Sequence, residues 1–330
     1  MLTSVVITYH NEGPLLERAV RSIDTQAGRA NIEIVVVDDA SDIPPPPMAS
    51  RWPLRVIRSE RSLHVSGARN LGIRHAQGDL VAFLDADDEY AANRIAPHVA
   101  FFEEHPEALM VGGQTYLTRD GEAVLRTPPV IERYYPKIAE RGGMLPDAVR
   151  WHVCNVELCK QGLIVLFGTG AMTIRRHVLE EIGGFDEQLF LAEDWDIQVR
   201  IAQHGPIGFV AMPAYYYHAG RQGSITTIKN PAQYLCGARA YRSWRRTVVG
   251  LPKPYVVALR AREHEAALLA AQLWLERRGD PVNAMKAVIR SFRAGVSMWA
   301  VRSLVRSMLW RGLLVTRSAV RASGGATFTF

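Results

Sequence analysis

The feature that most constrains the fold of this 330-residue chain is a pair of apolar runs that each end abruptly in acidic residues. The run IEIVVVDD ends at Asp38 and Asp39, and the run LVAFLDADD ends at Asp85, Asp87 and Asp88. Continuous apolar runs of this kind are typical of strands that are covered on both faces of a sheet. The chain is therefore expected to form a sheet between layers of helices, with acidic residues gathered where its strands end.

Helical segments separate the apolar runs. A third apolar run, TSVVIT, comes before the other two, and after it apolar residues from Leu15 to Ile23 recur at helical spacing. The segment VSGARNLGIRHAQG predicts a helix that ends at Gly78. Alternating strands and helices of these lengths indicate βαβ units and a mostly parallel sheet. Because ligands of such sheets bind beyond the carboxyl ends of the strands, we expect the polar residues after each run to converge on one site.

Charge is distributed unevenly along the chain. From Leu251 to the end there are 13 Lys or Arg and 4 Asp or Glu residues, whereas the first 250 residues contain 26 and 29. The apolar content of 48% is ordinary for a globular protein. We expect no signal peptide and no membrane-spanning segment, and we expect the three cysteines to be reduced thiols.

The segment LDADD raises a question of charge compensation. Residues i and i+2 of an extended segment point the same way, so Asp85 and Asp87 would approach one cation together. A hard divalent ion fits paired carboxylates, and Mg²⁺ typically shares its shell with substrate phosphates. The alternative is a solvated acidic turn, because a D-x-D pattern alone is a weak signal.

Five blocks, in order, resemble the family 2 glycosyltransferases, which are inverting enzymes of GT-A fold. They are SVVITYHNEGPLLERAVRSI, IEIVVVDDASD, GARNLGIRHAQGDLVAFLDADD, GGFDEQLFLAEDWDIQVRIAQHG and RQGSIT, and they extend over roughly residues 3–225. The resemblance implies a GT-A α/β fold, Rossmann-like, with a mostly parallel sheet flanked by helices. It also implies metal-dependent transfer of a sugar from a nucleotide diphospho-sugar to an acceptor hydroxyl. The Q-x-x-R-W motif of processive synthases is absent, which favours a single-transfer enzyme.

Carried onto matching positions, the resemblance assigns the nucleotide to the ends of the first strands. Thr8 and Tyr9 would contact the base, Tyr9 by stacking, and Arg69 would lie near the nucleotide or its phosphates. Asp38 or Asp39 would accept a hydrogen bond from the base or ribose. A carboxylate acceptor opposite a base N–H favours UDP as the leaving group. Each assignment has a structural alternative: a packed tyrosine, a turn aspartate, or a solvated arginine.

The resemblance also assigns the metal and the diphosphate. Asp87 would be the principal ligand of Mg²⁺ or Mn²⁺, and Asp85 would approach the metal or the ribose. His218 would be a third metal ligand or merely a loop histidine. Arg221 and Ser224 would close over the diphosphate when the donor binds.

The proposed catalytic base lies in EDWD. Asp194 matches the family's base, which removes the acceptor proton as the hydroxyl attacks from the far side of the anomeric carbon. Glu193 would be its neighbour near the acceptor. The alternative is that both acids only favour a helix N-terminus electrostatically.

We therefore expect a GT-A catalytic domain over residues 1–230, with a nucleotide-binding half (1–113) and an acceptor half (114–230). A basic helical region follows over residues 231–330. Its amphipathic helices would contact anionic lipid, a second subunit in a homodimer, or the catalytic domain itself; no motif supports nucleic-acid binding. The acceptor would be a carbohydrate, a lipid-linked sugar or another hydroxyl, and the location cytoplasmic, with peripheral contact to the inner face of the cell membrane. Two rival functions are a nucleotidyltransferase on a related fold and a non-catalytic sugar-nucleotide-binding scaffold.

Overall fold

The computed structural model describes residues 1–26, 31–119, 121–154, 166–189, 191–220, 231–278 and 280–292. The chain divides into two compact units. The first contains residues 1–229 together with residues 243–258, and the second contains residues 230–242 and those from 259 onward.

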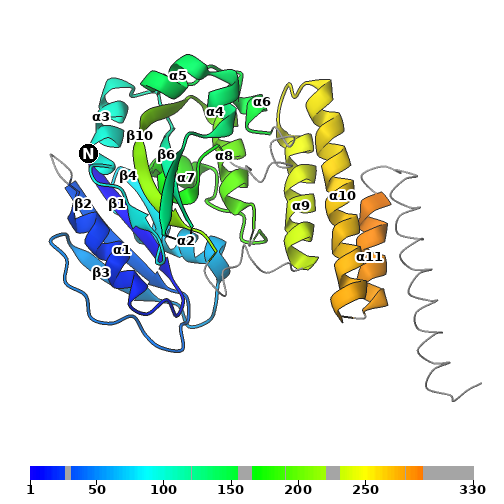
Figure 1. Cartoon of the computed structure of the whole chain (residues 1–330), viewed down its shortest axis with the longest axis horizontal. Helices are drawn as coiled ribbons and strands as arrows, with labels where there is room; N and C mark the ends of the chain where they lie inside the picture. Colours follow the sequence, from blue (N-terminus) through cyan, green and yellow to red (C-terminus); the bar gives the residue numbers. More distant parts are fainter. Residues whose placement is uncertain are drawn as a thin grey trace, which may run out of the picture. The chain divides into compact units, whose positions relative to one another are not determined.

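The first unit is built on one sheet, whose ten strands within the described residues follow the order β3-β2-β1-β4-β9-β6-β10-β5, with β7 on β6 and β8 on β10 (Figure 1). The strands are β1 (Leu2–Tyr9), β2 (Asn31–Asp38), β3 (Leu54–Arg58), β4 (Leu80–Asp85), β5 (Glu89–Tyr90), β6 (Met110–Arg119), β7 (Glu122–Arg126), β8 (Gly143–Met144), β9 (Met172–Arg175) and β10 (Ile207–His218).

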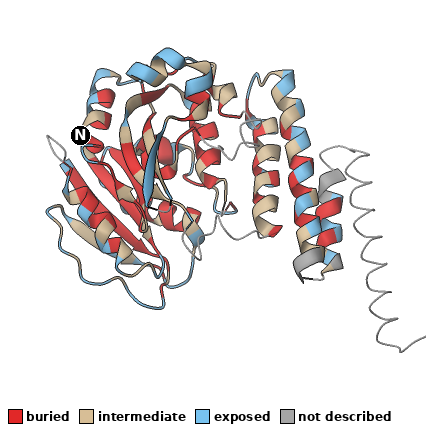
Figure 2. Ribbon diagram, viewed as in Figure 1, coloured by how far each residue is buried: buried red, intermediate tan, exposed pale blue. Residues whose placement is uncertain are grey.

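The first four strands of the sheet are all parallel, as the sequence predicts. Their register places Tyr9 beside Asp38 and Thr8 beside Asp85, so the polar ends of β1, β2 and β4 meet at one edge. Crossovers between parallel strands are right-handed, and α1 and α2 connect their strands in opposite directions along the sheet. The two helices therefore cover opposite faces, which explains why β1, β2 and β4 are buried, whereas the edge strand β3 is not (Figure 2).

Helices account for most of the remaining chain (Figure 1). They are α1 (Leu15–Asp24), α2 (His64–His75), α3 (Ile95–Glu104), α4 (Pro129–Tyr134), α5 (Pro136–Arg141), α6 (Val149–His152), α7 (Arg176–Glu181), α8 (Glu193–His204), α9 (Pro231–Thr247), α10 (Lys253–Arg278) and α11 (Pro281–Phe292). The long periodic helices match the sequence expectation closely. The short helices α4 to α6 lie in a stretch whose residues show no clear period.

The second half of the sheet is mixed: β10 is parallel to β6, but the other pairs there are antiparallel. β9 pairs antiparallel with both β4 and β6, and β5 pairs antiparallel with β10. β10 contains Pro213, where its register with β6 shifts, because proline has no N–H to donate to the ladder. The shift lets one long strand extend to His218, at the same edge as Asp85.

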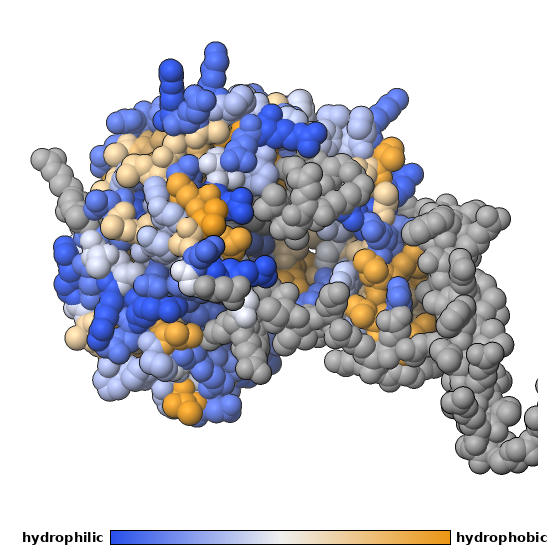
Figure 3. All heavy atoms as spheres, in the orientation of Figure 1, coloured by the Kyte–Doolittle hydropathy of each residue, from blue (hydrophilic) through white to orange (hydrophobic). Residues whose placement is uncertain are grey.

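The second unit is helical. Small residues of α10 (Ala270, Ala271) and α11 (Ala284, Ala287) form its core, so these helices pack closely. In the space-filling view hydrophobic side chains are visible on its surface (Figure 3). Val282, Met285 and Ile289 of α11 are exposed. No helix in the described ranges combines the length and the apolar character needed to cross a bilayer.

Close approach of α2 to β1 positions the residues that α2 contributes to the site. At Gly72 an added Cβ would lie 2.2 Å from Val6 Cγ1. Val6 is buried and belongs to a central strand, so it cannot move aside without displacing its neighbours. A glycine at this position therefore sets the depth of α2 against the sheet.

We predict that Gly72→Ala lowers stability, because overpacking a core typically costs about 1–3 kcal/mol. Gly237→Ala is the matched control: it also replaces a helical glycine, but its Cβ would have no neighbour closer than 3.7 Å. Both changes gain roughly 1 kcal/mol of helix propensity. In urea unfolding, Gly72→Ala should be clearly less stable than Gly237→Ala, and equal stability of the two would contradict this packing account.

Candidate active site

The ends of β1 and β4 form the floor of the candidate site. Thr8 Oγ1 donates a hydrogen bond to Asp85 Oδ1 at 3.1 Å. Asp85, Asp87 and Glu89 are each half-buried, while Ala86, Asp88 and Tyr90 between them are buried. Ala86 and Asp87 form a turn, closed by a hydrogen bond from the backbone N–H of Asp88 to the Asp85 carbonyl at 3.0 Å. The extended geometry expected from the D-x-D spacing is therefore wrong, and the half-buried Asp87 carboxylate is presented by a turn.

Arg69 of α2 joins this floor to α8. Its guanidinium donates to Asp85 Oδ1 at 2.9 Å and to Glu193 Oε1 at 2.8 Å, and only 3% of its side chain is exposed. Burial alone would lower the pKa of Arg69, but the charges of Asp85 and Glu193 outweigh it and raise that pKa. Arg69 is therefore a permanent cation between two carboxylates, rather than the solvated arginine of the alternative interpretation.

Asp194 lies in the first turn of α8. The helix begins after Ala192, which has a left-handed backbone (φ 64°) that turns the chain sharply into the helix. Asp194 Oδ1 accepts a hydrogen bond from the backbone N–H of Trp195 at 2.8 Å. The buried Gln198 donates to the main-chain oxygen of Asp194 at 2.6 Å.

The pKa of Asp194 is raised to about 7. Burial is the largest cause and the negative charge of Glu193 the next, while Arg69 opposes both. A carboxyl with a pKa near neutrality suits a general base, because it is both substantially ionised and appreciably basic at pH 7. The helix N-terminus, which would lower the pKa, is outweighed here.

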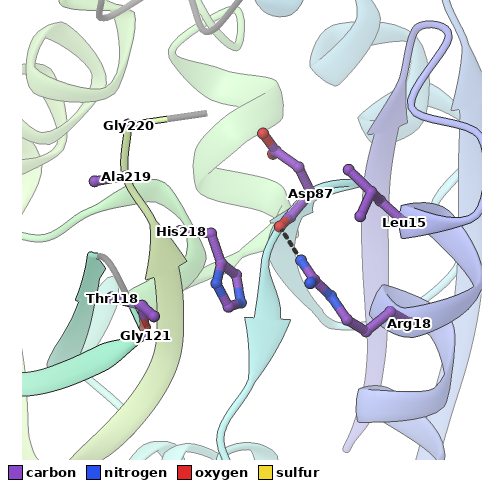
Figure 4. A pocket seen from close by; sticks show the side chains of 8 residues that line it. All are labelled: Leu15, Arg18, Asp87, Thr118, Gly121, His218, Ala219 and Gly220. Atoms are coloured by element: carbon purple, nitrogen blue, oxygen red, sulfur yellow. Dashed lines mark hydrogen bonds between the residues drawn. The ribbon is translucent and has the colours of Figure 1, made fainter. Parts of the chain in front are cut away.

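The acidic turn after β4 lines a pocket of about 310 Å³ (Figure 4). Its lining comes from four separate parts of the chain: Leu15, Arg18, Asp87, Thr118, Gly121, His218, Ala219 and Gly220. Arg18 donates to the main-chain oxygen of Asp87 at 2.6 Å and lies 3.1 Å from Glu89 Oε1. Arg18 and Glu89 were not among the residues predicted from the sequence, although Glu89 belongs to the same acidic run as Asp85 and Asp87.

Asp88 is buried, and its Oδ1 accepts the backbone N–H of His218 at 2.9 Å. Burial raises the pKa of Asp88 well above its usual value, and the charges of Asp85 and Asp87 add to the effect. The turn therefore concentrates negative charge that a cation would offset, so the carboxylates fit a divalent metal.

The structure brings together fewer potential metal ligands than the resemblance assigned. His218 lines the pocket, with its Nε2 2.9 Å from Glu89 Oε1. No group of three or more potential metal ligands converges anywhere in the described part of the chain. A Mg²⁺-like ion that takes one or two carboxylates and completes its shell with phosphates and water suits such a site.

Three residues assigned to the base lie deeper than expected. Tyr9 is 1% exposed and donates its hydroxyl to the Ile43 carbonyl at 3.3 Å, so no ring face is open for stacking. Asp38 is fully buried, with its oxygens on Arg58 and on the backbone N–H of Ser41. Asp39 accepts from Ser62 Oγ at 2.9 Å and from the backbone N–H of Leu63. All three stabilise the surrounding loops, which is the structural alternative for each.

Arg221 and Ser224 lie outside the described residues, so their assignment to the diphosphate stays a prediction. Residues 293–330 of the expected basic helical region lie outside them as well.

Comparison with known proteins decides the family. A family model described as Glycosyl transferase family 2 matches residues 4–156. An uncharacterized glycosyltransferase of Haemophilus influenzae is 31% identical over 209 residues, which cover 60% of this chain and 67% of the relative. The chain belongs to glycosyl transferase family 2. The resemblance stated from the sequence is thereby confirmed.

Another relative is the amylovoran biosynthesis glycosyltransferase AmsB of Erwinia amylovora, which is 26% identical over 235 residues covering 65% of this chain and 69% of AmsB. Other relatives are longer than the matched stretch. The stretch matched by this chain covers 62% of the succinoglycan biosynthesis protein ExoO of Rhizobium meliloti. In a probable N-acetylgalactosaminyltransferase of Caenorhabditis elegans it covers 35%.

Two solved structures show the same fold. S. aureus TarS 1–349 in complex with UDP-GlcNAc has a TM-score of 0.57 at 16% identity, covering 90% of this chain and 93% of its own. The mannosyltransferase PcManGT from Pyrobaculum calidifontis, in complex with GDP-Man and Mn²⁺, has a TM-score of 0.55 at 21% identity, covering 96% and 79%. The expected GT-A fold with a C-terminal helical region is confirmed.

We predict that Arg69→Met destabilises the protein by about 3–5 kcal/mol, the typical cost of leaving a buried charge without its partner. Glu193, whose side chain is 10% exposed, would lose its counter-charge. Arg21→Met is the control, because it breaks an exposed pair with Glu17 that is worth at most about 0.5 kcal/mol. Urea unfolding measures both, and similar losses would contradict the role given to Arg69.

Proposed function

We propose that this family 2 member transfers a sugar from a UDP-linked donor to an acceptor hydroxyl with inversion at the anomeric carbon. The donor would bind over Asp87 and Asp85 in the nucleotide-binding half (1–113), and the acceptor would approach Asp194 in the other half (114–230). The observation that carries the proposal is the Arg69 bridge, which holds the end of β4 and the start of α8 at the two ends of one guanidinium.

The donor side is supported by the acidic turn and the pocket beside it. Asp85 ends β4 and Asp87 lies in the turn that follows, and both carboxylates are half-buried, so they would be accessible to a shared cation. A bound Mg²⁺ or Mn²⁺ would stabilise the negative charge that develops on the departing diphosphate. Thr8 holds one Asp85 oxygen by its hydroxyl, and Arg69 holds the same oxygen, which orients the carboxylate.

The acceptor side is supported by Asp194. Burial and the neighbouring Glu193 keep its carboxyl basic, so it can accept the hydroxyl proton as the oxygen attacks. Glu193 is held on Arg69 and is therefore a positioning and electrostatic residue rather than a second base. An attack from the side opposite the diphosphate inverts the anomeric configuration.

The scaffold and nucleotidyltransferase alternatives are less well supported. A scaffold would not require a carboxyl raised to about pKa 7 next to a second buried acid. A nucleotidyltransferase would need a basic, glycine-rich phosphate loop early in the chain, whereas TYHNEGP is acidic.

The proposed partners are the nucleotide-sugar and a carbohydrate, lipid-linked or other hydroxyl acceptor. Contact with an anionic membrane surface through the basic C-terminal region belongs to the same proposal. In its described part, α11 supports this contact, because Val282, Met285 and Ile289 are exposed at helical spacing with the exposed Lys286 nearby.

We predict that Asp87→Asn and Asp194→Asn separate binding from chemistry. Asp87→Asn should weaken Mn²⁺-dependent UDP binding at least tenfold, because it removes a metal ligand's charge. Asp194→Asn should bind UDP within about twofold of the wild type but transfer sugar roughly 10²–10⁴-fold more slowly. Calorimetric titration and a transfer assay measure the two effects.

Asp147→Asn, at an exposed position, is the control and should change neither quantity. Equal loss of UDP binding in the Asp87 and Asp194 variants would defeat the division of labour. Metal-dependent UDP binding without donor hydrolysis or transfer by the wild type would favour the scaffold alternative.

The pH dependence provides a second test. Since the pKa of Asp194 is about 7 and the ionised form is the base, kcat/KM for the donor should rise with pH up to about 7 and then level off. Glu193→Gln removes a charge that raises this pKa and should move the midpoint to lower pH. Arg69→Met removes a charge that lowers it and should move the midpoint to higher pH. Shifts in the same direction for both variants would contradict the assignment of the midpoint to Asp194.

A further inference from the structure

The indole of Trp244 is buried against the helix that carries Asp194. Trp244 lies in α9, within the part of that helix that belongs to the first unit, and its side chain is fully enclosed. Its Nε1 donates a hydrogen bond to Asp196 Oδ1 at 2.9 Å. Its ring lies 4.7 Å from the ring of Trp195, at an interplanar angle of 53°.

Asp196 is itself buried and uses both of its oxygens. Oδ1 accepts from Trp244, and Oδ2 accepts from Arg200 Nε at 2.8 Å. Arg200 in turn donates to the main-chain oxygens of Ile182 at 3.1 Å and Gly184 at 2.7 Å. One carboxylate therefore connects α9, α8 and the turn that follows α7, and no charge in this network is left unpaired.

Trp195 fixes the same turn of α8 from another direction. Its indole N–H donates to the main-chain oxygen of Val153, next to α6, and its backbone N–H donates to the Asp194 carboxylate. Buried indoles thus hold both residues that follow Asp194: Trp195 is held by its own side chain, and Asp196 is held by Trp244. The direction of the Asp194 carboxylate depends on where this turn lies.

We propose that Trp244 and Asp196 are positioning residues for Asp194: their hydrogen bond and the contact between the two indole rings hold the first turn of α8 in the geometry that proton transfer needs. This inference rests on the proposed role of Asp194 as the base. The rate of transfer is sensitive to this geometry, since a displacement of about 1 Å at a reacting group can cost roughly 10²-fold in rate.

The rest of α8 does not depend on Trp244. Ile197, Val199 and Ile201 are each at most 1% exposed and anchor the middle of the helix in the core. Removing the indole N–H should therefore shift the first turn of α8 without unfolding the helix. The expected signature is a lower kcat with an unchanged KM for the donor, which binds at the other side of the site.

Trp244→Phe tests the inference, because it keeps an aromatic ring and removes the N–H. We expect kcat for sugar transfer to fall roughly 10- to 100-fold, with the donor KM within about twofold of the wild type. Trp52→Phe is the matched control: it removes an indole N–H that donates to the Ile23 carbonyl at 3.2 Å, in the same unit. It should leave kcat unchanged.

Asp196→Asn keeps the size of the side chain and carries the test if Trp244→Phe does not fold. Its single amide oxygen cannot accept from both Trp244 and Arg200, so it should also lower kcat. The double variant should lose less than the product of the two single effects, because both residues act through one network. Effects that multiply in the double variant, or a kcat that equals the wild type in both single variants, would overturn the inference.

A readout without turnover separates this inference from the proposed function. The Asp194 carboxyl can be followed by ¹³C NMR in protein labelled at aspartate, and Asp194→Asn identifies its signal. The midpoint near pH 7 should fall in Trp244→Phe, since a displaced carboxylate gains solvent, and stay unchanged in Trp52→Phe. An unchanged midpoint in Trp244→Phe overturns the inference. A shifted midpoint in a protein whose wild type transfers no sugar overturns the proposed function alone.

Discussion

The ion pairs of Arg69 connect the parts of this structure on which its chemistry depends. One buried guanidinium binds the carboxylate at the end of β4 and the carboxylate at the start of α8. These two residues are more than a hundred positions apart in the chain, and only the fold brings them together. The connection requires α2 to lie close against β1, which Gly72 permits. The position of the proposed base is thus linked to the packing of Gly72, in the half of the catalytic domain that we propose binds the nucleotide.

The acidic turn after β4 and the start of α8, which carries the proposed base, are subject to the same opposing electrostatic effects. Both concentrate like charges in partly buried surroundings, and both contain a carboxyl with a raised pKa, Asp88 in the turn and Asp194 in the helix. Such clusters do not stabilise a fold, because desolvation and repulsion both oppose ionisation. The proposed function accounts for both clusters, because a bound cation and an acceptor would complete their electrostatics. Arg69, on Asp85, and Arg18, on Glu89, offset part of the repulsion in the acidic turn.

Sequence patterns predicted the framework of the site well and its supporting contacts poorly. The ends of strands can be predicted because a continuous apolar run stops at a charged residue. Parallel pairing of β1 and β4 then brings Asp85 next to Thr8. Tyr9 and Asp38 illustrate the limit. Their partners, the Ile43 carbonyl and Arg58, come from a proline-rich loop and an edge strand whose path no local pattern encodes. The mixed half of the sheet escaped prediction for a similar reason, since short strands such as β5 are defined only by their neighbours.

Trp244 also changes how this chain should be shortened. The family motifs end well before it, so a fragment cut after residue 230 would keep every motif and appear to contain the whole catalytic machinery. That fragment would nevertheless lack the indole that satisfies Asp196, and a buried acceptor would be left facing an apolar void. Truncation after the last family motif would therefore keep the residues proposed to bind the donor. It would remove a contact that holds α8, the helix that carries Asp194.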